Sequence, residues 1–160
     1  YLKFMTSQNI VIGGLAGAMP PLLGWTAVSN TIEPNAWLLV LIVMVWTPPH
    51  FWALAVYRVE DYAEAGVPML PVQKGIAFTK QHIVLYTLLL LASTMLPYAV
   101  GMFQELYLVA ALILGLGFLY FSIKLYRDDT NSSAMQTFAY SISYLAALFG
   151  AMLVDQYLYL

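Results

Sequence analysis

The sequence has 160 residues, of which 62% are apolar and only 9% are charged, whereas about 25% are charged in an ordinary soluble domain. This composition excludes a soluble domain and indicates part of a polytopic α-helical membrane protein. A net charge of −2 without a basic patch argues against nucleic acid as a partner, and a sequence without cysteine excludes disulfides and thiolate metal sites. Because the chain starts with Tyr1 rather than Met, we expect it to begin part-way through a longer protein.

A membrane-spanning helix requires about 20 mostly apolar residues, and five stretches of the sequence meet this requirement. In chain order they are residues 9–28, 37–57, 82–103, 106–126 and 136–157. We therefore predict an all-α, polytopic transmembrane helical bundle that forms a single domain over residues 1–160. The Asn and Ser side chains of the linkers 29–35 and 127–133 are expected to cap the helices that follow them.

Two pairs of prolines fall inside the predicted spans, Pro20-Pro21 in the first and Pro48-Pro49 in the second. A proline inside a helix removes a main-chain hydrogen bond. In lipid, the carbonyl freed in this way must find a partner in a neighbouring helix or in a wet cavity. A proline-containing span therefore either lines a cavity or only improves packing, and the sequence leaves both possibilities open.

The positive charges of the sequence indicate its orientation in the membrane. All six cations fall on one side of the predicted bundle: Lys3, Arg58, Lys74, Lys80, Lys124 and Arg127. The opposite side carries only acidic residues, which are Glu33, Glu105 and Asp155. The positive-inside rule places the first side in the cytoplasm, or in the matrix of a mitochondrion. For Lys74, Lys80, Lys124 and Arg127 we expect no role beyond this topology signal.

The second predicted span ends in an unusual segment, residues 46–62 (WTPPHFWALAVYRVEDY). His50 is expected roughly 11 Å inside the cytoplasmic end of this span at 1.5 Å per residue. An ionisable group at that depth is costly unless it faces the bundle interior, which predicts a functional role. The alternative is a neutral histidine that is hydrogen-bonded and serves only packing.

If this helix continues into the following loop, His50, Tyr57 and Asp61 share one face and Arg58 lies at its edge. The guanidinium of Arg58 suits a diphosphate, and the carboxylate of Asp61 could hold Mg²⁺. The alternative is a solvated helix end with no ligand. The residues alone thus indicate a cytoplasm-facing site for an anionic, partly apolar ligand, which fits an enzyme as well as a transporter.

Three segments of the sequence resemble those of a known family. They are Leu2-Lys3 with residues 6–14 (TSQNIVIGG), residues 17–25 (GAMPPLLGW), and residues 46–55 (WTPPHFWALA) with residues 57–71 (YRVEDYAEAGVPMLP). Together they resemble the protohaem IX farnesyltransferase (haem O synthase) branch of the intramembrane aromatic prenyltransferases. The similarity covers most of residues 1–90, and beyond them only the hydropathy pattern agrees.

This resemblance implies a bundle of nine helices around a cavity open to lipid, with this chain supplying helices five to nine. It implies transfer of a farnesyl group from farnesyl diphosphate to a vinyl group of haem b, followed by addition of water to give haem O. Mg²⁺ is the implied cofactor, and haem A synthase or a terminal oxidase are implied assembly partners. The implied location is the bacterial inner membrane, or the mitochondrial inner membrane in a eukaryote. The family's Asn/Asp-rich first motif has no match here and is expected upstream.

The resemblance also implies roles for individual residues. Lys3 and Arg58 match positions that bind the diphosphate and serve catalysis. Asp61 matches the second acidic motif, as a catalytic residue that binds Mg²⁺ or organises Arg58. Tyr57 and Tyr62 belong to the same motif and are expected to contact substrate.

His50 matches a buried histidine of the family and is implied to bind haem, since imidazole suits iron. The sequence departs from the pattern at Phe4, where the family often has a basic residue. It also departs at Ala65, where related quinone-pathway enzymes carry a second aspartate, which argues for the haem branch. The alternatives are a prenyltransferase for a quinone-type or chlorophyll-type acceptor, or half of a secondary transporter with a midplane site.

Overall fold

The computed structural model describes residues 9–159, and these form helices joined by short connections. In chain order they are α2 (Asn9–Gly17), α3 (Pro20–Ser29), α4 (Pro34–Tyr57), α5 (Val59–Glu64), α6 (Leu70–Lys74), α7 (Ile76–Ala99), α8 (Glu105–Arg127) and α9 (Ala134–Leu158). Five helical segments are long and apolar enough to cross a membrane, and α2 and α3 together make one of them. The predicted all-α fold with five spans is therefore confirmed.

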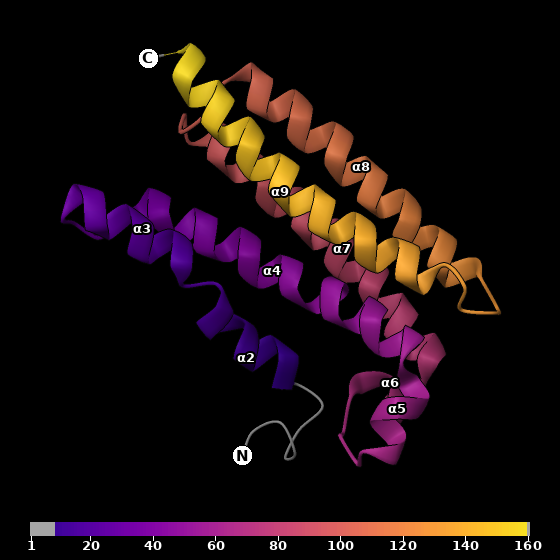
Figure 1. Cartoon of the computed structure of the whole chain (residues 1–160). Coiled ribbons are helices and arrows are strands. Elements are labelled where there is room, and N and C mark those ends of the chain that lie inside the picture. Colours follow the sequence, from indigo (N-terminus) through magenta and orange to yellow (C-terminus); the bar gives the residue numbers. More distant parts are fainter. Residues whose placement is uncertain (1–8, 160) are drawn as a thin grey trace.

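The four long helices run antiparallel to their chain neighbours and pack side by side (Figure 1). Both α4 and α8 contact α7 and α9, so the four helices form a closed group, and α2 and α3 pack against α4. The helices α5 and α6 lie at the same end of the bundle as the α8–α9 connection (Figure 1). This end therefore brings together segments that are some 70 residues apart in the sequence.

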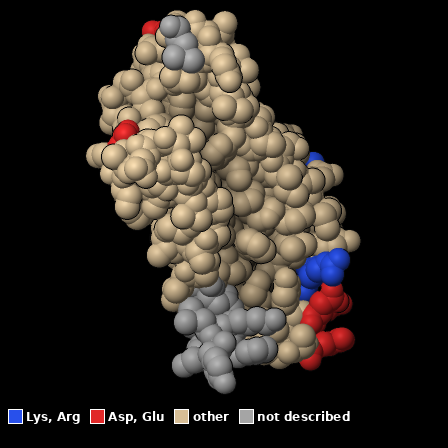
Figure 2. All heavy atoms as spheres, turned by 60° about the vertical axis from the view of Figure 1, so that its left-hand side comes forward, with Lys and Arg blue, Asp and Glu red and all other residues tan. Residues whose placement is uncertain are grey.

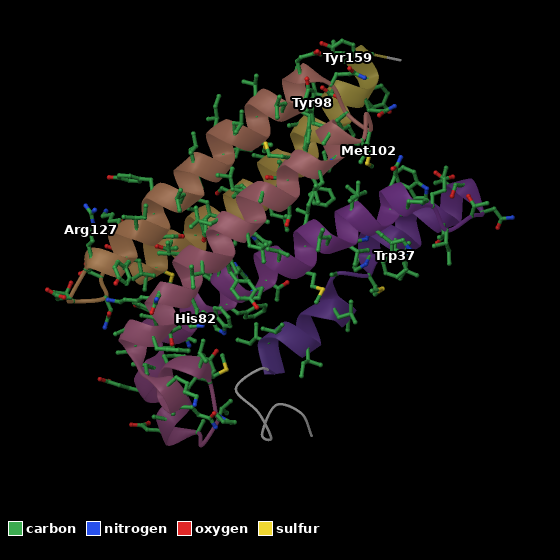
Figure 3. The ribbon with its side chains drawn as sticks, turned by 180° about the vertical axis from the view of Figure 1, so that it is seen from behind. Trp37, His82, Tyr98, Met102, Arg127 and Tyr159 are labelled. Atoms are coloured by element: carbon green, nitrogen blue, oxygen red, sulfur yellow. The ribbon has the colours of Figure 1, made fainter. Side chains whose placement is uncertain are left out.

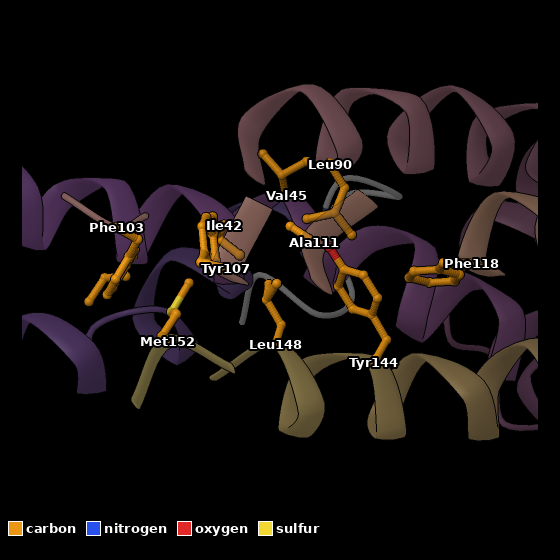
Figure 4. Close-up of a cluster of buried hydrophobic side chains, with 11 residues drawn as sticks. Ile42, Val45, Leu90, Phe103, Tyr107, Ala111, Phe118, Tyr144, Leu148 and Met152 are labelled. Carbon is orange, nitrogen blue, oxygen red and sulfur yellow. The ribbon is translucent and has the colours of Figure 1, made fainter. Parts of the chain in front are cut away.

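Apolar side chains from all four long helices meet in the centre of the group (Figure 4). Ile42 of α4, Tyr107 and Phe118 of α8, and Tyr144 of α9 are completely buried there. Lipid is as apolar as these side chains, so close packing and hydrogen bonds between helices must hold the group together. One such bond joins the Tyr107 hydroxyl, as donor, to the carbonyl of Thr94 on α7 at 2.8 Å.

The outer faces of the long helices are also apolar. Large exposed side chains on α7 and α8 include Leu85, Leu88, Leu89, Val109, Ile113 and Leu116. A water-soluble protein rarely exposes an apolar surface of this extent, whereas lipid chains solvate it. Together with the length of the five spans, this surface identifies an integral, multi-pass membrane protein.

The first span is broken where the sequence predicted an interruption. Helix α2 ends at Gly17, and α3 begins with Pro20 and Pro21 in its first turn. A proline is well tolerated there, because the first N–H groups of a helix have no partner within it. At the break the Ala18 N–H still donates to the carbonyl of Gly14 at 2.9 Å, which completes the last turn of α2.

The second proline pair behaves differently, because α4 runs unbroken through Pro48 and Pro49. Helix α2 lies close to α4 at this level: a β-carbon added to Gly14 would come within 3.0 Å of the Thr47 side chain. A larger residue at position 14 would require the Thr47 side chain to move. Both prolines are buried, so the pair lies at a packed helix contact.

The third span differs from its predicted limits, since α7 covers Ile76–Ala99 rather than 82–103. Its first turns contain Thr79 and Lys80 and were therefore missed by a search for apolar residues. At the other end the chain turns at Gly101, which has a φ of 73°, a value that glycine adopts without strain. The apolar Phe103 lies beyond this turn and packs back into the core.

The predicted caps in the linkers are wrong. Helices α4 and α9 have no side-chain hydrogen bond at their first residues. The hydroxyl of Ser133, which precedes α9, donates instead to the carboxylate of Asp128 at 2.7 Å. A local cap was expected because serine often bonds to the next turn, but a neighbouring carboxylate is the stronger acceptor.

A cap of another kind joins the last helix to α8. The carboxylate of Asp155, near the end of α9, accepts hydrogen bonds from the N–H groups of Gln104 and Tyr107 at 2.8 and 3.0 Å. These groups begin α8, where N–H donors lack partners and a negative charge is favourable. Only 1% of Asp155 is exposed, so this acidic residue is a structural link between two helices.

We expect Asp155→Ala to destabilise the protein by about 1–3 kcal/mol, because it leaves two N–H groups unpaired that had bonded to a charged acceptor. Asp155→Asn should lose less, since an amide oxygen can still accept. Thermal unfolding in detergent measures the change. Glu105→Ala is the matched control, because Glu105 is an exposed acid in the first turn of α8. Equal midpoints for Asp155→Ala and Glu105→Ala would show that the cap contributes nothing.

Charged side chains are few on the surface of the bundle. Figure 2 shows basic and acidic groups together at the lower right, a further basic group higher on the right edge, and acidic groups toward the upper left. Figure 3 places His82 and Arg127 toward the first end and Tyr98 and Tyr159 at the opposite one. Among the described residues, the cations thus share one end, as the sequence predicted.

Candidate active site

The charged residues predicted to act together lie at the junction of α4 and α5. Helix α4 ends at Tyr57, because Arg58 leaves the helical region with φ −108° and ψ 32°. The helical face that was predicted to run from His50 to Asp61 is therefore interrupted. In the next helix, Tyr62 packs against the small cluster that contains Val67 and Met69.

Arg58 and Asp61 nevertheless face each other across this junction. Arg58 Nη1 lies 3.7 Å from Asp61 Oδ2, and the two side chains are 56% and 69% exposed. A pair this exposed adds little to stability. Both groups are therefore accessible to a ligand, and a guanidinium beside a carboxylate can bind an anion and a cation at the same place.

Arg58 and Asp61 line a cavity of about 580 Å³ at this end of the bundle. Tyr57, predicted to contact substrate, lines it as well, whereas Tyr62 belongs to the packing beneath α5. The opposite wall is the α8–α9 connection at residues 130–132. The cavity thus lies between two segments distant in sequence, and most of its lining residues are polar or charged.

A single carboxylate organises the α8–α9 connection. Asp128 accepts five hydrogen bonds, two from Thr130, one from Ser132 and two from Ser133. The bonds from the side chains of Thr130 and Ser133 hold the pKa of Asp128 well below its usual range. Asp128 is consequently a carboxylate at neutral pH, and the connection keeps a fixed shape beside the cavity.

Lys80 of α7 bonds to the same connection. Its side chain is 6% exposed, and its ammonium donates to the main-chain carbonyl of Asp128. The end of a helix carries partial negative charge, which a cation stabilises, and α8 ends at Arg127. Lys80 was expected to serve only as a topology signal; the structure shows that it also bonds to this helix end.

His50 lies in the interior of α4, away from the residues that line the polar cavity. Its ring is stacked between Trp46 and Phe138, with centroid distances of 4.2 and 4.6 Å. His50 Nδ1 lies 2.6 Å from the Ser141 hydroxyl, which itself donates to the carbonyl of Phe138. His50 therefore uses Nδ1 in a hydrogen bond to α9, and Nε2 is its other ring nitrogen.

An apolar cavity of about 400 Å³ adjoins this histidine between α2 and α4. It is lined by Ile10, Gly13, Gly14, Gly17, Val43, Trp46, Thr47 and Phe51. A second apolar cavity, of about 420 Å³, shares Gly17, Val43 and Trp46 with it and extends toward α9. Trp46 and Phe51 both contact the His50 ring, so these two side chains stand between the histidine and the cavity that they line.

Two predicted features cannot be placed in this geometry. Lys3 lies outside the described residues. In residues 9–159 no cluster of three or more His, Asp or Glu side chains could hold a metal ion. Asp61 alone offers an exposed carboxylate at the cavity, and its role as a Mg²⁺ ligand stays a prediction.

Comparison with known proteins identifies the family of this chain. A family model described as the UbiA prenyltransferase family matches residues 1–152. The chain belongs to the UbiA prenyltransferase family. The family predicted from the segments around Pro20 and His50 is therefore confirmed.

Among curated UbiA-family relatives, a protoheme IX farnesyltransferase from Alcanivorax borkumensis is 60% identical over 99% of this chain and 52% of its own length. One from Marinobacter nauticus is 59% identical over 99% of this chain and 53% of its own length. The chain thus spans about half the length of the curated relatives it matches. A solved structure concerning digeranylgeranylglyceryl phosphate synthase in membranes shares the fold, with a TM-score of 0.72 at 18% identity over 96% of this chain and 50% of that one.

In this UbiA-family chain, sequence reasoning missed the α8–α9 connection as a wall of the polar cavity. A signal was present, because an aspartate in a polar linker often bonds to the main chain two residues later in an Asx turn. Asp128 and Thr130 form such a turn, with the Thr130 N–H donating to the carboxylate at 2.9 Å. The position of the turn opposite Arg58 depends on helix packing, which the local sequence does not reveal.

Proposed function

We propose that the full-length protein transfers the farnesyl group of farnesyl diphosphate to a vinyl group of haem b, giving haem O. The observation that carries this proposal is the 60% identity, over nearly the whole chain, to a protein named protoheme IX farnesyltransferase. The geometry supports it with a polar cavity at one end of α4 and apolar cavities along the same helix. A prenyl diphosphate and a large apolar acceptor require such a pair of sites.

The polar cavity suits the leaving group of this reaction. When the allylic C–O bond of farnesyl diphosphate breaks, both electrons leave with the diphosphate, whose negative charge must be stabilised. Arg58 offers a guanidinium there that is always charged and remains accessible beside Asp61. Lys3 is proposed to add a second cation. Tyr57 lines the same cavity and is proposed to contact the substrate.

The apolar cavities suit the carbon skeleton and the acceptor. The vinyl π electrons of haem b form the new C–C bond to C1 of the farnesyl group, and the cation left beside the macrocycle is captured by water, which then loses a proton. The glycines and aromatic residues between α2 and α4 exclude water from the first step. Mg²⁺, which prefers oxygen ligands such as the Asp61 carboxylate, would supply further positive charge to the diphosphate.

The proposed location is the cytoplasmic membrane of a bacterium or the mitochondrial inner membrane, with the Arg58 end facing the cytoplasm or matrix. The grouping of the described cations at that end supports this orientation. We propose haem A synthase or a terminal oxidase as assembly partners of the full-length protein.

The test uses the purified full-length protein in detergent or liposomes with radiolabelled farnesyl diphosphate, haem b and Mg²⁺. We expect haem O in the mass spectrum and diphosphate release that requires haem b. A parallel reaction with 4-hydroxybenzoate in place of haem b examines the quinone-type alternative. Release of diphosphate with the aromatic acid but not with haem b would reject the proposed acceptor.

A further inference from the structure

The α8–α9 connection supplies a wall of the polar cavity to which no role has yet been given. Thr130, Asn131 and Ser132 line this cavity opposite Arg58 and Asp61. Two of these three side chains are already engaged, because the hydroxyls of Thr130 and Ser132 donate to the Asp128 carboxylate. Asn131 is thus the residue of this wall whose side chain is not bonded to Asp128.

The backbone holds Asn131 in an unusual and well-defined conformation. Its φ is 60°, in the left-handed region that asparagine tolerates better than most residues. Its main-chain carbonyl accepts from the N–H of Ala134 at 3.1 Å. Its neighbours on both sides bond to Asp128, and Lys80 bonds to the Asp128 carbonyl. The position of Asn131 beside the cavity is therefore fixed by the connection itself.

The side chain of Asn131 lacks the partner that such a position normally provides. Its Oδ1 atom is buried and has no hydrogen-bond partner within residues 9–159. Because Oδ1 is the buried end of the carboxamide, its two N–H donors are the part of the side chain that can meet a ligand in the cavity.

We propose that Asn131 binds the diphosphate group of the prenyl substrate from the wall opposite Arg58. Diphosphate oxygens accept hydrogen bonds, and the N–H donors of the carboxamide supply them without adding charge. The α8–α9 connection is then part of the substrate site, and Lys80 is a positioning residue for it. This inference rests on the proposed function, because it takes a prenyl diphosphate as the ligand of this cavity.

Two substitutions in the full-length protein test the proposal. Asn131→Gly removes the carboxamide while keeping the left-handed backbone, which glycine adopts freely. Asn131→Asp keeps the shape but places a negative charge opposite the diphosphate. We expect inorganic diphosphate and farnesyl diphosphate to bind about tenfold more weakly to Asn131→Gly, the loss typical of a hydrogen bond to a charged group, and still more weakly to Asn131→Asp. Haem b affinity should not change.

Asn30 provides a matched control. It is the other asparagine with positive φ among residues 9–159, at 57°, and it ends α3 at the opposite end of the bundle. Asn30→Gly and Asn30→Asp should bind diphosphate as the unmodified protein does. Equal diphosphate affinity in Asn131→Gly and Asn30→Gly would overturn the inference, as would equal loss of haem and diphosphate affinity, which indicates general misfolding.

The diphosphate affinity of the Asn131 variants can be measured independently of whether the protein forms haem O. Binding of inorganic diphosphate, measured by competition with a labelled prenyl diphosphate, does not depend on the acceptor. If the protein forms haem O while Asn131→Gly binds diphosphate normally, the function stands and this inference fails. If it forms no haem O but Asn131→Gly loses diphosphate affinity, the inference stands and the proposed acceptor is wrong.

Discussion

Arg58→Ala and Asp61→Asn are each expected to lower the rate of haem O formation at least about 100-fold, the loss typical of removing one group that stabilises transition-state charge. Arg58 lines the cavity in which we propose that the diphosphate charge develops, and Asp61 lies 3.7 Å from it. Folding should be unaffected, because an exposed ion pair contributes about 0–1 kcal/mol. Haem O yield per folded protein, with the thermal midpoint measured in parallel, checks both statements.

Matched controls lie close by. Arg127→Ala removes an exposed arginine from the end of α8, and Glu64→Gln neutralises the last acid of α5, which does not line the cavity. Both variants should form haem O at the unmodified rate. Arg58→Lys should recover part of the rate, since it keeps the charge but loses the fork of donors that matches phosphate oxygens. Near-normal yield from Arg58→Ala or Asp61→Asn would remove that residue from the site.

The second large effect concerns His50. We expect His50→Ala to lose at least tenfold in haem b affinity while binding farnesyl diphosphate normally. The imidazole bonds to Ser141 through Nδ1, which leaves Nε2 as the ring nitrogen that we propose binds iron. It lies beside the apolar cavities rather than in the polar one. A diphosphate at His50 would be a charge deep in the membrane, which is strongly disfavoured.

His82 is the matched control for this experiment, since the sequence has two histidines. His82 lies on α7, where its Nδ1 contacts the carbonyl of Phe78 at 2.9 Å, and His82→Ala should bind haem normally. Ser141→Ala should weaken haem binding less than His50→Ala, because it removes only the group that orients the ring. Visible absorbance titration with haem b gives each affinity. Loss of diphosphate binding with haem binding preserved in His50→Ala would show the assignment to be wrong.

The spans and the motif around Arg58 could be predicted from the sequence because each depends on neighbouring residues. A run of about 20 apolar residues forms a helix in lipid whatever packs against it. The start of α7 was missed because the polar residues Thr79 and Lys80 interrupt the apolar run there. Only the fold shows that both are buried.

The rest of the candidate site depends on contacts between distant segments. Lys80 meets the Asp128 carbonyl across 48 residues of sequence, and His50 meets Ser141 across 91. The break at Arg58 was also missed, because no proline or glycine marks it in the sequence. These features required the packed bundle, since no local pattern specifies them.

Helix α4 also sets a fixed length between the two halves of the proposed reaction. From His50 to Tyr57 it is uninterrupted, a distance of about 10 Å at 1.5 Å per residue. The helix therefore fixes both the distance and the angle about its axis between His50 and the polar cavity. Adding one residue within this stretch would turn the histidine about 100° relative to the polar cavity. Each site would keep its own residues, yet the carbon to be transferred would no longer point at its acceptor.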